Sequence, residues 1–303
     1  MTVALTGATG FVGKAVLAEA ARQGADVRAL TRRDSAAQPG VTWVAGDLAD
    51  RNALDRLVKG SEAVLHIAGV VSAPDAAGFQ AGNVTGTLNL IEAARGAGVG
   101  RFVFVSSLSA REPQLSAYGA SKRKAERLVM ASGLDWTIVR PPAIYGPHDA
   151  EMFELFRSAA KWGVVPLPPA GRLSLIHVAD LARLLLALVP GGEGVTGCVF
   201  EPDDGHPGGW THREMGRAIG WAVGRRPWTP HFSPGILANA ARIDGIVRRG
   251  RAKLTADRVG YMCHPDWVAS PARAVPAELW RPQIGLRDGL RETAAWYREA
   301  GWL

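Results

Sequence analysis

Three glycines spaced by three residues follow the first apolar stretch of the chain, and they constrain its fold more than any other feature. Residues 2–6 suit a buried parallel strand, and GATGFVG then places Gly7, Gly10 and Gly13 before a helical stretch that ends at Gly24. Gly7 permits a tight turn, Gly10 lets the backbone approach a pyrophosphate, and Gly13 lets the helix pack on the strand. The helix N-terminus then offers N–H groups to the anion. The pattern predicts a dinucleotide-binding loop.

The alternation of strand and helix continues through the first half of the chain. Further strands are expected at residues 26–30, 43–48, 63–69, 101–107 and 136–142, and helices at residues 83–98 and 118–132. This order predicts an α/β fold with a doubly wound parallel sheet of the Rossmann type. Ligands bind at the carboxyl ends of the strands in such a sheet, so the residues that follow the strands are the candidates for chemistry.

The rhythm changes near residue 147, which suggests a second region. We expect residues 1–146 plus about 172–190 to form the dinucleotide-binding domain, with a helix at 178–189 returning to the sheet. Residues 147–171 plus 191–303 would form a smaller, mainly helical C-terminal lobe that binds the substrate.

Two arginines follow the second expected strand. A carboxylate at the end of this strand would bind the ribose 2′-hydroxyl of NAD, but the chain has Thr31, Arg32 and Arg33 there. Guanidinium groups suit a 2′-phosphate, so the sequence favours NADP(H), with NAD(H) as the alternative. The other interpretation is that one or both arginines only face water.

A tyrosine and a lysine lie four residues apart at the start of the helix expected at 118–132. Residues i and i+4 of a helix share a face, so Tyr118 and Lys122 would be neighbours. A lysine ammonium beside a phenol favours the phenolate and lowers its pKa, which suits proton exchange with a hydroxyl or carbonyl. The Y-x-x-x-K pattern is common, so this inference depends on the rest of the chain.

The composition limits the classes of protein that fit. Of the 303 residues, 47% are hydrophobic and 21% charged, which is enough for a buried core. Cys198 and Cys263 lie far apart, so we expect a reduced, cytoplasmic protein with neither disulfides nor a metal site. We expect no signal peptide and no spanning helix. The net charge of +7 fits anionic ligands or an arginine-rich solvated surface, and no nucleic-acid-binding module is present, so no nucleic-acid partner is expected.

Eight motifs occur in one order along the chain. They are TGATGFVG at 6–13, GDL at 46–48, HIAG at 66–69, NVTGTLNL at 83–90, VFVSS at 103–107, Y-x-x-x-K at 118–122, RPPAIYGP at 140–147 and IHVADLA at 176–182. In this order they resemble the extended short-chain dehydrogenase/reductase superfamily, which includes NAD-dependent epimerases and dehydratases. The resemblance covers essentially the whole chain.

The resemblance implies roles for individual residues. Tyr118 would be the general acid/base, Lys122 would lower its pKa and hold the nicotinamide ribose, and Ser107 would hydrogen-bond the substrate oxygen. Both Tyr118 and Lys122 would also contact the cofactor. The other cofactor-binding residues would be Gly7, Thr9, Gly10, Phe11, Val12, Gly13, Arg32, Arg33, Asp47, Leu48, Ala68, Gly69, Val105, Ser106, Pro141, Ala143 and Ile144.

Four other polar residues of the motifs are expected to have structural roles. His177 and Asp180 would brace the start of a helix rather than take part in catalysis. Asn83 would anchor a loop near the cofactor, and His66 would be a packed strand residue.

Two features bear on the substrate. The connection between Ser107 and Tyr118 is short, which is more similar to the branch of bacterial ceramide reductases and the complex I accessory subunit than to sugar-nucleotide enzymes. The C-terminal sequence resembles that of steroid and flavonol reductases. Together they favour a hydrophobic ketone or alcohol, such as a 3-oxo-ceramide or a steroid-like ketone. The alternatives are a nucleotide-sugar epimerase or dehydratase with tightly bound NAD(P), and a non-catalytic NADP(H)-binding sensor or assembly protein.

Residues 233–254 contain apolar residues at helical spacing among arginines. The apolar set is Ile236, Leu237, Ala240, Ile243, Ile246 and Val247, and the arginines are Arg242, Arg248, Arg249 and Arg251. Such a helix can lie on an anionic membrane surface, or it can be an ordinary helix with one face in the core. The sequence thus admits peripheral membrane contact. The resemblance also implies a homodimer formed through the helix of Tyr118 and its neighbour.

Overall fold

A sheet of parallel strands forms the framework of the protein, for which a computed structural model describes residues 1–248 and 254–303. Within the described residues the sheet has seven strands in the order β10-β6-β5-β4-β1-β2-β3. These strands are β1 (Thr2–Thr6), β2 (Asp26–Thr31), β3 (Val41–Ala45), β4 (Ala63–His66), β5 (Arg101–Val105), β6 (Asp135–Val139) and β10 (Cys198–Phe200). The predicted doubly wound Rossmann sheet is confirmed.

The register brings the carboxyl ends of the strands to one edge of the sheet. Leu5 of β1 pairs with Ala29 of β2 and with Leu65 of β4. Leu65 in turn pairs with Val103 of β5. Apolar side chains on both faces of these strands are fully buried, as expected for a parallel sheet covered on both sides. Strands β2 and β3 are added on one side of β1, and β4 and the later strands on the other, so the strand order reverses between β1 and β4, which is where such sheets bind ligands.

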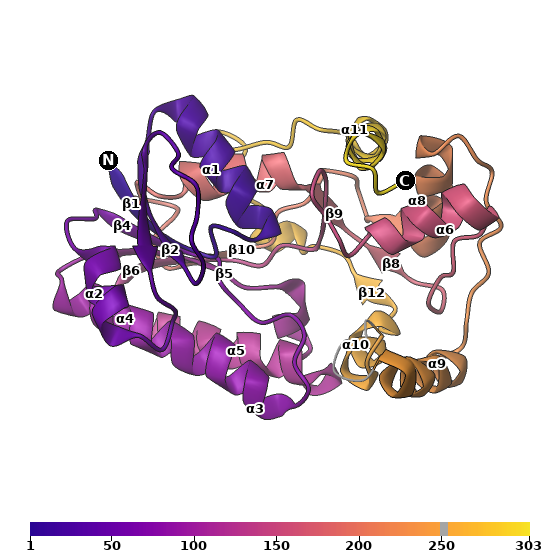
Figure 1. Ribbon diagram of the computed structural model, residues 1–303, viewed down its shortest axis with the longest axis horizontal. Coiled ribbons are helices and arrows are strands. Elements are labelled where there is room, and N and C mark those ends of the chain that lie inside the picture. The colour runs from indigo at the N-terminus through magenta and orange to yellow at the C-terminus, as the bar shows by residue number, and fades with distance from the viewer. Residues whose placement is uncertain (249–253) are drawn as a thin grey trace. The chain divides into compact units, whose positions relative to one another are not determined.

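Helices cover both faces of the sheet (Figure 1). Helices α1 (Phe11–Gln23) and α7 (Val178–Ala187) lie on one face, and α2 (Arg51–Val58), α4 (Gly86–Gly96) and α5 (Ala117–Met130) lie on the other. Local signals set their ends: Gly24 ends α1 in the left-handed conformation, and the Asp50 side chain caps α2 by accepting the Ala53 N–H.

The helix expected at residues 83–98 begins differently from the prediction. The chain forms a short α3 (Ala76–Phe79) and then a π-helical turn, η1 (Gln80–Thr85), before α4. Asn83 is buried in this wide turn and bonds to the loop after β4 and to α5, so a tertiary contact accompanies the change in helical winding.

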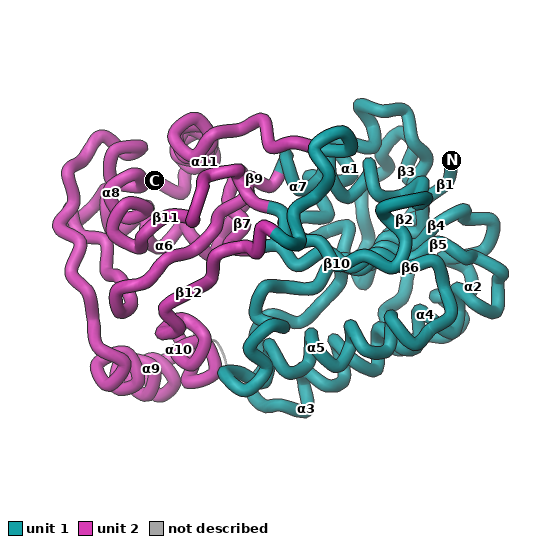
Figure 2. Tube along the Cα trace, turned by 180° about the vertical axis from the view of Figure 1, so that it is seen from behind, with its two compact units in different colours: residues 1–141, 179–202, 272–280 teal, residues 142–178, 203–271, 281–303 magenta. Residues whose placement is uncertain are grey.

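The chain divides into two compact units, which Figure 2 colours separately. Unit 1 contains residues 1–141, 179–202 and 272–280, and unit 2 contains residues 142–178, 203–271 and 281–303. The predicted boundaries differ from this division in four places. Residues 142–146 and 172–178, which were assigned to the dinucleotide-binding domain, lie in unit 2. Strand β10 lies in the sheet of unit 1 although residues 191–303 were assigned to the lobe, because Cys198 pairs with Thr137 of β6. Residues 272–280 also return to unit 1, where the indole of Trp280 donates to the Asp180 carbonyl over 3.1 Å.

Unit 2 is mainly helical around short strands, as predicted. Its helices are α6 (Phe153–Trp162), α8 (His212–Ala222), α9 (Pro234–Arg248), α10 (Ala256–Met262) and α11 (Leu286–Glu299). Its strands are β7 (Ala143–Tyr145), β9 (Leu175–His177), β8 (Arg172–Leu173), β11 (Trp210–Thr211) and β12 (Asp266–Trp267). Phe156, Ile219, Leu290 and Tyr297 form the centre of its core. The sequence pattern missed α6. Among the described residues, no helix is long and apolar enough to cross a membrane.

Candidate active site

The glycine loop between β1 and α1 is closed by contacts that only glycine permits. Gly7 has a φ of +79°, and a Cβ atom there would lie 2.7 Å from the Ala68 nitrogen. A Cβ atom at Gly13 would lie 2.0 Å from the Gly7 carbonyl oxygen. The first and third glycines therefore let the loop, the helix and the segment after β4 approach one another.

The N-terminus of α1 suits an anionic group. Gly10 is the N-cap residue, has no side chain with which to cap the helix, and is exposed together with Thr9. Phe11 and Val12, half-buried, begin the first turn, so their N–H groups lie where an α-helix cannot satisfy them internally. The loop can therefore hold a pyrophosphate through main-chain donors.

The segment after β4 joins the glycine loop to the lysine of α5. The Ala68 N–H donates to the Thr6 hydroxyl over 3.2 Å, at the end of β1. A Cβ atom at Gly69 would lie 3.3 Å from Lys122 Nζ, so this backbone passes directly beside the ammonium group. The predicted sites at Gly7, Ala68, Gly69 and Lys122 thus form a continuous row.

Tyr118 and Lys122 lie one turn apart near the start of α5. Ser116 caps this helix by accepting the Gly119 N–H over 2.9 Å. Tyr118 is half-buried, with its ring centroid 6.1 Å from that of Phe79. Lys122 is only 4% exposed.

The buried ammonium of Lys122 is fixed by the end of β5. Its Nζ donates to the Val105 carbonyl over 2.8 Å and lies 4.8 Å from the Phe104 ring centroid. Burial lowers the pKa of Lys122 to about 8, although the Glu126 carboxylate acts in the opposite direction. The lysine can therefore change its charge near neutral pH.

Ser107 lies two residues after β5, which ends at Val105. It is the N-cap residue of the 3-10 turn η2 (Leu108–Arg111), and its hydroxyl accepts the Ser109 N–H over 3.2 Å. A Cβ atom at Gly119 would lie 2.5 Å from the Ser109 carbonyl oxygen. The glycine next to Tyr118 therefore allows the turn that carries Ser107 to pack tightly on α5. Sequence reasoning did not single out Gly119.

A buried ion pair lies behind the two serines. Ser106 donates to Glu126 Oε1 over 2.7 Å, and Arg140 binds both carboxylate oxygens of Glu126 at 2.7 Å each. Glu126 is 0% and Arg140 4% exposed. Burial by itself would raise the pKa of Glu126, but the bonds and charge of Arg140, with Ser106 and Arg123, lower it. The carboxylate is therefore charged at neutral pH.

A second carboxylate extends this pair into a cluster. Arg140 Nη1 also lies 3.2 Å from Glu201 Oε1, and Arg111 Nη1 lies 3.3 Å from Glu201 Oε2. Glu201 follows β10 and Arg111 belongs to η2, so the cluster links both to α5. Sequence reasoning missed the cluster; the available signal was Glu126, which lies four residues after Lys122 on the same helix face.

His66 and Asn83 form the polar contacts expected of structural residues. His66, fully buried, contacts the Thr6 and Thr87 hydroxyls at 2.6 Å and 2.9 Å. Burial, with the nearby Lys122 charge, lowers the pKa of His66 to about 3, so it is neutral. Asn83 accepts the Val70 N–H and donates to the Ser121 hydroxyl, which fastens the loop after β4 to α5.

The predicted adenine-side residues follow β2 and β3. Arg32 and Arg33 are exposed directly after β2, the neighbour of β1 in the sheet. The Asp47 carboxylate accepts the Ala49 and Asp50 N–H groups at 2.8 Å and 3.2 Å, and the Leu48 carbonyl accepts a bond from Asn89. These positions fit the predicted edge of the sheet.

The predicted nicotinamide-side residues fall in both units. In unit 1 the Pro141 carbonyl accepts the Leu108 N–H over 3.1 Å, which holds η2 against the end of β6. Ala143 and Ile144 belong to β7 of unit 2, where they pair with Leu175 and Ile176 of β9. Their contact with a cofactor stays a prediction.

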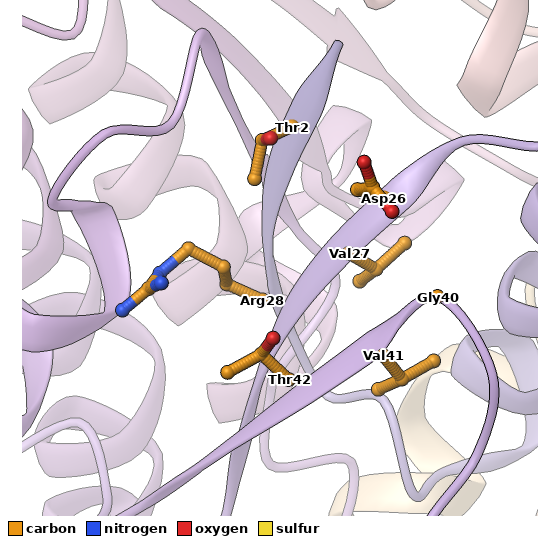
Figure 3. A pocket seen from close by; sticks show the side chains of 7 residues that line it. All are labelled: Thr2, Asp26, Val27, Arg28, Gly40, Val41 and Thr42. Atoms are coloured by element: carbon orange, nitrogen blue, oxygen red, sulfur yellow. The ribbon is translucent and has the colours of Figure 1, made fainter.

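A cavity of about 360 Å³ lies at the amino ends of strands in the large sheet, away from their carboxyl ends (Figure 3). It is lined by Thr2, Asp26, Val27, Arg28, Gly40, Val41 and Thr42, at the amino ends of β1, β2 and β3. The Arg28 guanidinium is already bound to the carbonyls of Leu57 and Arg56. The cavity therefore contains none of the predicted site residues.

Comparison with known proteins identifies the family. The model of the NAD dependent epimerase/dehydratase family matches residues 3–197. The chain belongs to this family. Ceramide reductase of Caulobacter vibrioides is 41% identical over 99% of this chain and 96% of its own. The 2-alkyl-3-oxoalkanoate reductase of Stenotrophomonas maltophilia is 29% identical over 97% of this chain and 99% of its own.

Solved structures of the extended superfamily share the fold of this epimerase/dehydratase-family chain. MoeE5 in complex with UDP-glucose and NAD is 24% identical, covers 99% of both chains and superimposes with a TM-score of 0.75. The predicted superfamily and the prediction of an enzyme are confirmed. The protein is thus a short-chain dehydrogenase/reductase of an NAD-dependent family.

Proposed function

We propose that this enzyme is an NADP(H)-dependent oxidoreductase that interconverts a ketone and a secondary alcohol on a hydrophobic, lipid-like substrate. The observation that carries the proposal is the placement of Tyr118 and Lys122 on one face of α5, with Lys122 bound to the end of β5 beside Gly69. A 3-oxo-ceramide is the sharpest candidate substrate, because a ceramide reductase is 41% identical over nearly the whole chain.

The roles of the side chains follow from their chemistry. NADPH, when bound, supplies a hydride to the carbonyl carbon. Tyr118 donates its hydroxyl proton to the carbonyl oxygen, and the Ser107 hydroxyl donates a hydrogen bond to the same oxygen. The Lys122 ammonium, one turn away, stabilises the tyrosinate that remains and binds the ribose hydroxyls. Solvent returns the proton to Tyr118, which completes the cycle.

The preference for NADP(H) rests on Arg32 and Arg33. Both are exposed after β2, the strand next to β1, where a 2′-phosphate would lie in a Rossmann sheet. Their guanidinium groups can bind that phosphate at two points each. We also propose a cytoplasmic location and a homodimer. Sedimentation of the purified protein would test the homodimer.

The test begins with cofactor binding. NADPH and NADH are titrated into wild-type protein and into Arg32→Ala, Arg33→Ala and the control Arg95→Ala, in which an exposed arginine at the far end of α4 is removed. We expect tighter binding of NADPH, and at least about a tenfold loss of that preference in Arg32→Ala, in Arg33→Ala or in both, but not in Arg95→Ala. Equal binding of both cofactors by all proteins would contradict the preference.

The second step measures turnover. NADPH oxidation is followed with 3-oxo-ceramide, and formation of the sugar product is followed with UDP- and dTDP-sugars, using wild-type protein, Tyr118→Phe and Lys122→Ala. We expect turnover of the lipid ketone that both substitutions reduce by at least about a hundredfold. Turnover of a nucleotide sugar with retained NAD would instead favour the epimerase or dehydratase alternative, and full turnover by Tyr118→Phe would exclude the proposed acid.

A further inference from the structure

Helix α9 (Pro234–Arg248) carries apolar side chains on two opposite sides. One side contains Ala241, which is 6% exposed. Helix α9 contacts α10 within unit 2 (Figure 1). On the opposite side Ile236, Ala240, Ile243 and Val247 follow at spacings of four, three and four residues, which places them along one line. Ile246 lies beside this line.

The outward line is exposed to an unusual degree. Ile236 is 53% exposed, Ile243 62%, Val247 73% and Ile246 77%. These five residues, Ile236, Ala240, Ile243, Ile246 and Val247, are named the α9 stripe. A contiguous exposed apolar surface of this kind marks an interaction site, because leaving it in water opposes the hydrophobic effect.

Positive charge flanks the α9 stripe. Arg242 is exposed on one side of it, and Arg248 at the end of the helix is half-exposed. Asp244 is the acidic residue of this helix, and it is engaged by Arg248 at 3.0 Å and by the Leu254 N–H at 2.9 Å. The sequence then continues with Arg249, Arg251 and Lys253, which lie outside the described residues.

We propose that the α9 stripe is a docking surface for the headgroup region of an anionic lipid bilayer. An apolar line embedded at the level of the headgroups, with arginines beside it, is the arrangement by which a helix lies in a membrane interface. Each arginine adds attraction to anionic lipid. The stripe and its flanking arginines belong to α9, so membrane docking does not depend on the substrate proposed above.

The charges disfavour a second copy of the chain as the occupant. Two-fold pairing of two α9 helices would place the same surface on both partners. A second copy would bring the same arginines, Arg242 and Arg248, beside the stripe, and like charges repel each other. An anionic surface has the complementary charge, whereas a second copy does not.

The test is flotation of the full chain with vesicles. Wild-type protein is mixed with phosphatidylcholine vesicles or with vesicles that also contain phosphatidylglycerol. The stripe variant carries Ile243→Glu and Val247→Glu, and its control is Val71→Glu, a 54% exposed apolar residue of unit 1. The charge variant is Arg242→Glu, with Arg95→Glu as control. Thermal unfolding and NADPH binding establish that each variant is folded, separately from any catalytic result.

We expect wild-type protein and both controls to float with the anionic vesicles, and weakly with phosphatidylcholine alone. The stripe variant should lose at least about tenfold in vesicle affinity, and Arg242→Glu about tenfold on anionic vesicles only. Equal flotation of the stripe variant and its control would overturn the proposal. Absence of binding by the wild-type chain would also overturn it, as would a stripe variant that changes only from dimer to monomer.

Discussion

The Nζ atom of Lys122 on α5 donates to the main-chain carbonyl of Val105 at the end of β5 over 2.8 Å. This bond fixes a buried charge of the catalytic helix to the strand whose next residues are Ser106 and Ser107. The same ammonium lies beside the backbone of Gly69, after β4. One side chain thus connects the ends of the neighbouring strands β4 and β5, and its charge state can be tested directly.

Cofactor affinity should depend on pH through Lys122. Its pKa is lowered by burial to about 8, so the ammonium loses its proton as the pH rises through 8 and no longer donates as a cation. We expect wild-type affinity for NADPH to fall by about tenfold to a hundredfold above that pH. Titration by fluorescence from pH 6 to 10 measures the change.

Two variants separate this effect from other titrations. Lys122→Arg stays protonated over the range, so its affinity should be flat across pH 8, whereas Lys122→Met should bind weakly throughout. A break near pH 8 that persists in Lys122→Met would assign the titration to another group.

Glu126→Gln should lower stability and move the titration of Lys122. Arg140 would remain buried without its two-point partner, and breaking a buried pair from one side costs about 3–5 kcal/mol. The carboxylate also favours the charged lysine, so its loss should shift the break in NADPH affinity to a pH below 8. Denaturant unfolding and the pH titration measure the two effects.

The matched control for Glu126 is Glu92→Gln. Glu92 pairs with Arg51 on the surface, where both partners are about half-exposed, so its removal should change little. If Glu126→Gln behaved like Glu92→Gln in both measurements, the buried cluster would contribute neither to stability nor to the pKa of Lys122.

Gly119→Ala should reduce turnover while it preserves cofactor binding. The added methyl group would lie 2.5 Å from the Ser109 carbonyl oxygen and push η2, with Ser107, away from α5. Overpacking of this kind costs about 1–3 kcal/mol. The measurements are unfolding, NADPH affinity and turnover of the carbonyl substrate.

Gly96→Ala provides the comparison for Gly119. It is a helical glycine of the same unit with open space at its Cβ position, so the substitution should leave turnover unchanged. Equal turnover by the two alanine variants would show that close packing of η2 on α5 is not required.

His66→Gln should flatten the acid dependence of stability. The pKa of His66 is lowered to about 3 in the folded protein, so between about pH 6.5 and 3 the unfolded chain binds a proton that the folded chain does not. Wild-type stability should therefore decline as the pH falls through this window, by up to about 1.4 kcal/mol per pH unit from this group. The difference in unfolding free energy between wild type and variant isolates the contribution of His66 to the pH dependence of stability. A difference that does not change with pH would contradict the buried, neutral state of His66.

The sequence predicted the sheet because each of its signals is local. The apolar run of β1, the three glycines and the four-residue spacing of Tyr118 and Lys122 act through neighbouring backbone geometry. Because ligands bind at the carboxyl ends of parallel strands, the residues that follow the strands could be assigned to one edge of the sheet without knowledge of their contacts. The sequence did not predict strand β10, because this strand is three residues long and is stabilised by pairing with β6 rather than by a hydrophobic pattern of its own.

What the sequence determined by itself was the fold class, the glycine loop and the pair on α5, since periodicity and backbone freedom are properties of adjacent residues. Only the tertiary structure decided that Glu126 meets Arg140 and Ser106, that Gly119 admits the turn of Ser107, and that the α9 stripe faces outward. Glu126 lies in α5, and Arg140, 14 residues later, follows the end of β6. The free energy of such a contact depends on burial and geometry, which arise only when the elements pack together.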